Sequence, residues 1–192
     1  MKEHQTTNKM KPLIIVVCLF NTLCVKGQDL YKSSNGKLRF YSDALLEDIE
    51  ATTVKATAAF NVTTGSVAVL IPIKSFEFDK SLMKEHFNEN YLESDKYPDA
   101  SFKGKMMDKL VITPGGSNRV SVSGELLIHG VSQHRDITID LKVNTDGSVV
   151  ATGKFDVSVA DHKVKIPTLV FQNIAEVVEV TFEITLKPAI HP

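Results

Sequence analysis

The sequence has no tryptophan, and its two cysteines, Cys18 and Cys24, both fall within the first 27 of 192 residues. Those 27 residues have the form of a secretory signal peptide, because lysines precede an apolar run at 13–20. Removal of this segment would leave a chain without cysteine, which excludes disulfides, thiolate metal ligands and a cysteine nucleophile. The remaining 165 residues would then depend on a hydrophobic core alone for stability.

Long apolar runs are also scarce. The run at 13–20 is about half of the ~20 residues that a helix needs to cross a bilayer, so we expect cleavage rather than anchoring. Without residues 1–27 the chain keeps 18 basic and 22 acidic side chains, a net charge of −4, which argues against a nucleic-acid partner. We therefore expect a periplasmic or secreted protein, without stable membrane insertion, whose single domain spans residues 28–192.

Motifs for metal binding and catalysis are missing as well. His86, His129, His134 and His162 are scattered and form no His-x-x-x-His pair, whereas a zinc site needs three or four converging ligands. No Gly-x-Ser-x-Gly motif, phosphate-binding glycine loop or dinucleotide fingerprint occurs. The sequence therefore predicts no metal, no cofactor and no enzymatic activity.

What the sequence has in abundance is alternation of apolar and polar residues. A period of two is typical of strands with one buried face. Between Asp79 and Ser94 the period changes to i, i+3 and i+4, which predicts one short helix that Pro98 prevents from continuing. The alternating segments lie at about 38–42, 53–62, 67–73, 100–106, 120–129, 136–143, 149–159 and 178–186.

The connections between these segments are short, which makes the strands antiparallel. The turn residues at 63–66 and 144–147 favour hairpins. Both a sandwich and a barrel fit this pattern. Phenylalanines mixed with Gly104, Gly124 and Gly153 on the inward face favour the barrel, because glycine lets strands bend sharply. We predict an all-β fold, an eight-stranded antiparallel barrel with one short helical insertion and room for one small ligand.

Two segments of the chain resemble a known family. The first contains FNENYLES at 87–94 and KYPDASFKG at 96–104, and the second is GELLIHGVS at 124–132. In order and spacing they are similar to the YceI-like proteins, and the similarity extends from about Leu38 to Leu186. This resemblance implies a lipocalin-like barrel, exported to the periplasm or beyond, with a tunnel for a long apolar chain such as a polyisoprenoid.

The chain differs from better-known members of that family in two respects. It has no tryptophan. Residues 160–167, ADHKVKIP, stand where those members carry an arginine-containing segment that ends in phenylalanine and glycine. The second difference concerns the head group of the ligand more than the fold.

Inward-facing apolar residues form the candidate ligand site. Their period alone is typical of any β core, but the family resemblance favours a ligand-lined cavity. An isoprenoid chain has almost no hydrogen-bonding groups, so its affinity must come from apolar burial at about 25 cal/mol per Å². Tyr91, Tyr97 and His129 are candidates for the cavity mouth or for an ordinary capping contact. The predicted ligand-binding residues are Phe40, Ala58, Phe60, Tyr91, Tyr97, Phe102, Leu126, Ile128, Ile139, Phe155 and Phe182.

The leading hypothesis is an exported protein that holds a polyisoprenoid or other long-chain lipid in an apolar cavity and performs no covalent chemistry. One alternative is a ligand-free barrel that serves as an interaction or structural module of the cell envelope. Another is an enzyme that modifies an isoprenoid or quinone on the same scaffold. Such an enzyme would need titratable side chains inside the barrel. Arg135 is the one charged residue at a position where the alternation predicts an inward-facing side chain.

Overall fold

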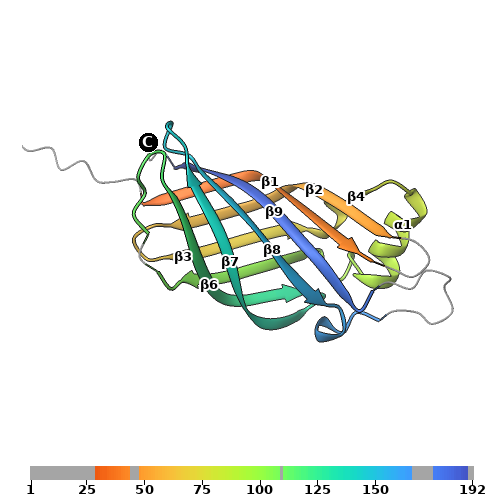
Figure 1. The fold of residues 1–192 in the computed structure, drawn as a ribbon. Helices are drawn as coiled ribbons and strands as arrows, with labels where there is room; N and C mark the ends of the chain where they lie inside the picture. The colour runs from red at the N-terminus through yellow and green to blue at the C-terminus, as the bar shows by residue number, and fades with distance from the viewer. Residues whose placement is uncertain (1–28, 44–47, 109, 166–174, 190–192) are drawn as a thin grey trace, which may run out of the picture.

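The computed structural model describes residues 29–43, 48–108, 110–165 and 175–189. Most of these residues lie in strands (Figure 1). The expected signal peptide at 1–27 lies outside the described residues. The strands are β1 (Leu30–Ser42), β2 (Ile49–Asn61), β3 (Ser66–Pro72), β4 (Glu77–Phe78), β5 (Asp99–Met106), β6 (Ser117–Ile128), β7 (Val131–Val143), β8 (Val149–Ser158) and β9 (Val177–Pro188).

Eight of these strands close into an antiparallel barrel. Neighbours follow the order β1-β9-β8-β7-β6-β5-β3-β2, and β2 pairs back with β1 to complete the wall. The two-residue strand β4 is an addition that pairs with β2. Closure gives each of the eight strands a paired neighbour on both sides, which is how barrels limit edge-to-edge association. The predicted eight-stranded barrel is confirmed.

The predicted helical insertion is also confirmed, and it lies at one end of the barrel (Figure 1). Helix α1 (Ser81–His86) continues directly into the π-helical turn η2 (Phe87–Tyr91), with Met83 and Tyr91 buried toward the barrel. Two 3-10 turns, η1 (Ile73–Ser75) and η3 (Ala160–His162), lie near the same end. Among the helices that the structure describes, none has the length and apolar composition needed to cross a bilayer.

Strand β1 begins eight residues earlier than the sequence predicted, at Leu30 rather than Leu38. The pairing of β1 with β2 shifts register between Ser33 and Gly36 and again between Gly36 and Leu38. Each shift is a β-bulge, which interrupts the period-two pattern on which the prediction depended. Gly36 is required there, because an added Cβ would lie 2.9 Å from Cγ1 of Ile184.

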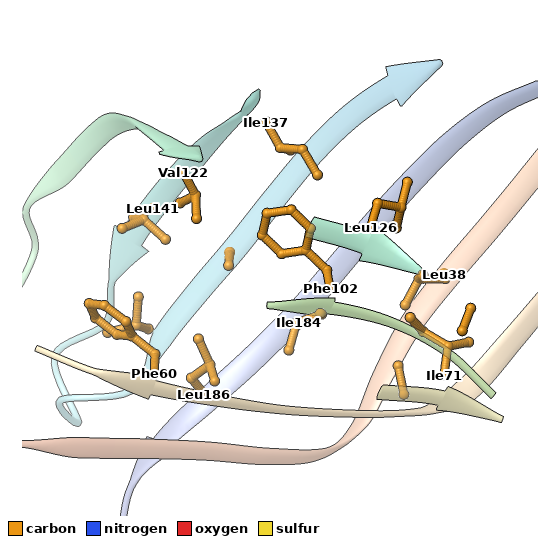
Figure 2. Packing of buried hydrophobic residues seen from close by; sticks show 14 of the residues in the cluster. Leu38, Phe60, Ile71, Phe102, Val122, Leu126, Ile137, Leu141, Ile184 and Leu186 are labelled. Atoms are coloured by element: carbon orange, nitrogen blue, oxygen red, sulfur yellow. The ribbon is translucent and has the colours of Figure 1, made fainter. Parts of the chain in front are cut away.

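The half of the barrel farther from α1 is filled by its own side chains. Figure 2 shows Phe60, Leu141 and Leu186 directed into this interior, and all three are buried. Large and small residues alternate to fill the space. Gly153, for example, lies so close to the ring of Phe182 that an added Cβ would be 2.5 Å from Cζ. This half of the barrel is therefore a packed core.

The closest backbone approach among the described glycines joins β5 and β6. Gly104 and Gly124 are paired, and an added Cβ at Gly124 would lie 2.4 Å from both Cα of Gly104 and the carbonyl oxygen of Lys103. Backbone atoms cannot rotate away as a side chain can.

Gly124→Ala should therefore lower the free energy of unfolding by about 2 kcal/mol in urea titrations followed by circular dichroism. The control Lys103→Ala changes an exposed side chain and should alter it by less than about 0.5 kcal/mol; equal effects would contradict this prediction.

Candidate ligand cavity

An apolar cavity of about 160 Å³ lies at the end of the barrel that α1 covers. Its wall combines barrel strands with the helical segment, β4 and η3. Apolar side chains supply nearly all of the lining, and Arg39, Ser42, Tyr91 and His162 are the polar members. The apolar members are Leu38, Phe40, Ile49, Ile71, Ile73, Phe76, Phe78, Met83, Phe87, Leu92, Ala100, Leu126, Ile128, Phe155, Val157, Val159, Val164, Val178 and Val180.

Four phenylalanines join the helical segment to the barrel beside this cavity. The ring of Phe87, on η2, stacks on Phe40 of β1 with centroids 5.3 Å apart. It also contacts Phe78 at 5.0 Å and Phe76 at 5.7 Å, in tilted and edge-on arrangements. Aromatic pairs at these separations contribute about 0.5–1.5 kcal/mol each beyond the area they bury. Phe87 therefore links the helical segment to Phe40 of the barrel wall, to Phe78 of β4 and to Phe76 just before β4.

The structure brings five of the eleven predicted residues together at the cavity. They are Phe40, Tyr91, Leu126, Ile128 and Phe155. Burial raises the pKa of the Tyr91 hydroxyl above its usual value. That these five residues contact a ligand stays a prediction.

The other six predicted residues do not line the cavity. Five belong to the packed part of the interior: Ala58, Phe60, Phe102, Ile139 and Phe182. The sixth is Tyr97, whose ring packs edge-on against His129 with centroids 4.6 Å apart. The alternation of the sequence correctly placed the interior residues on the inner face of their strands. It carried no information about how far along the barrel axis each residue lies.

Sequence reasoning missed several cavity residues. Met83 and Phe87 lie on the apolar face of the predicted helix, and Phe76 and Phe78 alternate just before it, so the signal was present. His162 is different, because it lies in a short 3-10 turn where no periodicity indicates an inward direction.

A polar network borders the cavity near the β6–β7 turn. Nε2 of His129 lies 2.7 Å from Oε2 of Glu93, and its Nδ1 lies 3.2 Å from the backbone oxygen of His162. The hydrogen bond from His129 holds the pKa of the Glu93 carboxyl below its usual value. His129 and Gly130 both have positive φ, as the type I′ form of a two-residue hairpin turn requires.

The β7–β8 ladder is interrupted beside the cavity. Paired residues run from Val143 and Val149 only as far as Ile139 and Gly153, beyond which the two strands have no common pairs. The turn η3 lies against this part of β7. Three bonds hold it: Nη2 of Arg135 to Oδ2 of Asp161 at 2.8 Å, Nε2 of Gln133 to the Asp161 backbone oxygen at 2.9 Å, and Nδ1 of His162 to the Val131 backbone oxygen at 3.0 Å.

Arg135, the charged residue expected on the inward face, does not line the cavity. Its guanidinium pairs with Asp161, and its side chain is 32% exposed. The arginine hydrogen bond in turn holds the pKa of the Asp161 carboxyl below its usual value. Arg135 therefore serves to hold η3 rather than to supply a charge inside the barrel.

The outer wall carries a serine–histidine–glutamate arrangement that resembles a hydrolase triad. Oγ of Ser123 lies 3.1 Å from Nε2 of His134, and Nδ1 of His134 lies 3.1 Å from Oε1 of Glu125. His134 and Glu125 are 64% and 56% exposed. Ser123 lies within ladders to both β5 and β7, so the strand supplies no pair of free backbone amides for an oxyanion hole. This arrangement is a cross-strand polar contact rather than a catalytic centre.

The described residues also contain no group of three or more histidine, cysteine, aspartate or glutamate side chains placed to hold a metal ion.

The closed antiparallel barrel with an apolar cavity at one end defines a lipocalin-like β-barrel protein. A family model described as "YceI-like domain" matches residues 32–186, which is most of the chain. The chain therefore belongs to the YceI-like family, as the sequence resemblance indicated. No curated protein matches the chain significantly.

Solved structures share the fold at low sequence identity. A polyisoprenoid binding domain from Saccharophagus degradans, implicated in plant cell wall breakdown, superposes with a TM-score of 0.73 at 16% identity, covering 84% of this chain and 99% of its own. Burkholderia cenocepacia BcnA gives 0.62 at 19% identity, with 78% and 95% covered. The Campylobacter jejuni YCEI protein gives 0.54 at 16% identity, with both chains fully covered.

Phe87→Ala should destabilise the protein by about 2–4 kcal/mol, because it removes the ring that contacts three other phenylalanines. Leu82→Ala is the matched control, since Leu82 is on the same helical segment but is 57% exposed. Urea unfolding should show a change of less than about 1 kcal/mol for the control. Similar losses in both variants would show that the aromatic cluster adds nothing specific.

The Glu93–His129 contact predicts a pH dependence. The folded pKa of Glu93 lies below its usual value of 4.5, so its contribution to stability is present above that pH and is lost as the pH falls through the folded pKa. The melting temperature of Glu93→Gln should therefore fall less steeply on acidification below about pH 5 than that of the unchanged protein. Glu85→Gln, at an exposed position on α1, should leave the slope unchanged. Parallel curves for Glu93→Gln and the unchanged protein would refute the prediction.

Proposed function

We propose that this protein binds a polyisoprenoid or another long-chain lipid through the apolar part of the ligand. The observation that carries the proposal is the cavity of about 160 Å³, lined almost entirely by apolar side chains, at the helix-covered end of a closed barrel. Such a lining offers little to a polar solute but gains free energy from every apolar group that it removes from water. The polyisoprenoid binding domain from Saccharophagus degradans has the same fold, which supports this proposal.

The volume of the cavity limits how a long chain can bind. A cavity near 150 Å³ holds a molecule about the size of benzene, and pockets for larger ligands span roughly 300–1,000 Å³. Only a short apolar segment therefore fits the cavity in this conformation. A longer chain requires the helical segment to move away from the barrel, and the contacts of Phe87 with Phe40, Phe76 and Phe78 are those that would separate.

We propose further that binding involves no covalent chemistry. Three of the polar groups of the cavity are engaged with groups outside it: Oγ of Ser42 accepts the N–H of Ala175, Nδ1 of His162 lies against the Val131 oxygen, and Nη2 of Arg39 lies 2.6 Å from Oε2 of Glu50. An activated nucleophile needs a base within hydrogen-bonding reach, and none of these contacts supplies one. We also propose export to the periplasm or beyond, on the basis of the signal-like residues 1–27.

One observation favours the alternative of a ligand-free interaction module. Much of the barrel interior is filled by buried side chains, so the cavity is small compared with a long-chain ligand. Native mass spectrometry of the protein purified from an envelope extract, followed by organic extraction, separates the two functions. A stoichiometric long-chain lipid supports the binding protein. A mass that stays ligand-free after incubation with geranylgeraniol and with quinones supports the module.

Replacement of each of two buried alanines by leucine tests whether the cavity is the binding site. Ala100 lines the cavity and Ala151 belongs to the packed half, and each is 7% exposed. Ala100→Leu should fill the cavity, weaken geranylgeraniol binding by at least about tenfold and change stability by less than about 1 kcal/mol. Ala151→Leu should lower stability by about 1–3 kcal/mol through overpacking and leave affinity within about twofold. Unchanged affinity in Ala100→Leu would place the ligand elsewhere.

A further inference from the structure

The cavity stops partway along the barrel, although the wall continues beyond it. On β5 the change occurs between Ala100, which lines the cavity, and Phe102, the next residue of the same face, which does not. On β9 it occurs between Val180, which lines the cavity, and Phe182, which does not. Phe102 and Phe182 are therefore the first inward side chains beyond the lining on their strands, and we call them the floor phenylalanines.

The floor phenylalanines border the lining from opposite walls. Phe102 pairs with Leu126 of β6, and Phe182 pairs with Leu38 of β1, and both leucines line the cavity. The rings of Phe182 and the lining residue Phe155 have their centroids 6.4 Å apart. Strands β5 and β9 are four places apart in the closed order of eight, so the two side chains enter the interior from opposite sides.

Each floor phenylalanine places its ring over a glycine. An added Cβ at Gly104 would lie 2.8 Å from Cε1 of Phe102, and one at Gly153 would lie 2.5 Å from Cζ of Phe182. Gly104 is the inward residue that follows Phe102 on β5, and Gly153 is paired with Phe182. The two rings thus fill space that the glycines leave empty. Without the rings, the hollow part of the barrel would extend to these glycines.

The interior beyond the floor phenylalanines is already occupied. Figure 2 shows Phe102 directed into the barrel, where Val122, Leu141 and Phe60 are also buried. Protein interiors are close-packed, so a ring cannot swing into space that other side chains fill. An apolar chain in the cavity therefore has no free space to enter beyond this level.

We propose that the floor phenylalanines set the length of apolar chain that the cavity accepts. A cavity near 150 Å³ holds a molecule about the size of benzene, so the site selects the end of a chain, about one isoprene unit, rather than its whole length. The lining presents carbon rather than nitrogen or oxygen to the cavity, so the hydrocarbon end enters and a polar head group stays outside. The inference rests on the proposed function, because it defines the length of chain bound at the same site.

A series of 1-alkanols from pentanol to dodecanol measures this length by calorimetric titration of the full protein. Each CH₂ group that enters the cavity should raise the affinity about fourfold. The rise should stop where the cavity is full, and longer alkanols should bind within about twofold of one another, because their further CH₂ groups are not buried. A rise that continues to dodecanol would overturn the inference. Binding of none of the alkanols would overturn the proposed function itself.

Phe102→Ala removes one floor ring, and Phe60→Ala is its matched control. The two phenylalanines are 6% and 4% exposed, but Tyr31 and Val67, the paired neighbours of Phe60, do not line the cavity. Both variants should be less stable than the unchanged protein. Only Phe102→Ala should lengthen the accepted chain, by about two to four CH₂ groups, because the volume of its ring joins the cavity. The same stopping length in Phe102→Ala and the unchanged protein would overturn the inference and leave the proposed function intact.

Leucine variants keep the test valid if the alanine variants do not fold. Leucine keeps an apolar side chain and removes less volume than alanine does. Phe102→Leu and Phe182→Leu should each lengthen the accepted chain by about one CH₂ group, whereas Phe60→Leu should leave it unchanged. An equal stopping length in all three leucine variants would overturn the assignment of the floor.

Discussion

The pairing of β1 with β2 closes the barrel, and the cavity depends on that closure. Without it, the sheet would be an open layer with β1 and β4 at its edges, and the inward side chains would have no opposite wall. Strand β1 pairs with β9 on its other side, and closing the sheet on itself requires its strands to curve. The register shifts around Gly36 lie in this pairing, and an extra residue in one strand bends that strand and increases its local twist.

Closure encloses two kinds of interior within one wall. Phe60, Leu141 and Leu186 fill one part of the barrel, whereas the helix-covered end keeps a cavity between the wall and the ring of Phe87. The filled part supplies a buried hydrophobic core. The described strands contain no cysteine, so they depend on this core rather than on disulfides for stability. The cavity residues also contribute to stability, since Phe87 lines the cavity and packs against three other phenylalanines.

The sequence predicted the wall of the barrel better than its contents. Alternation identifies strands because the two faces of the wall meet different environments, and it predicted all eight barrel strands and the helix. It did not distinguish Phe102, which belongs to the packed interior, from Phe155, which lines the cavity, because the alternation predicts only that both side chains point inward. Height along the axis depends on strand register and closure, which involve residues far apart in the sequence. His162 was missed because a 3-10 turn has no inward or outward period.

The interruption of the β7–β8 ladder has a consequence for the dynamics of the barrel. Where a ladder is unbroken, backbone hydrogen bonds protect the amides, but beside η3 this stretch of β7 is held instead by side-chain bonds from Arg135 and Gln133 to Asp161 of that turn. Local opening at such a place breaks few backbone hydrogen bonds, so its free energy lies below that of global unfolding. We therefore expect amide hydrogens along the unpaired part of β7 and β8 to exchange with solvent while the rest of the wall stays folded.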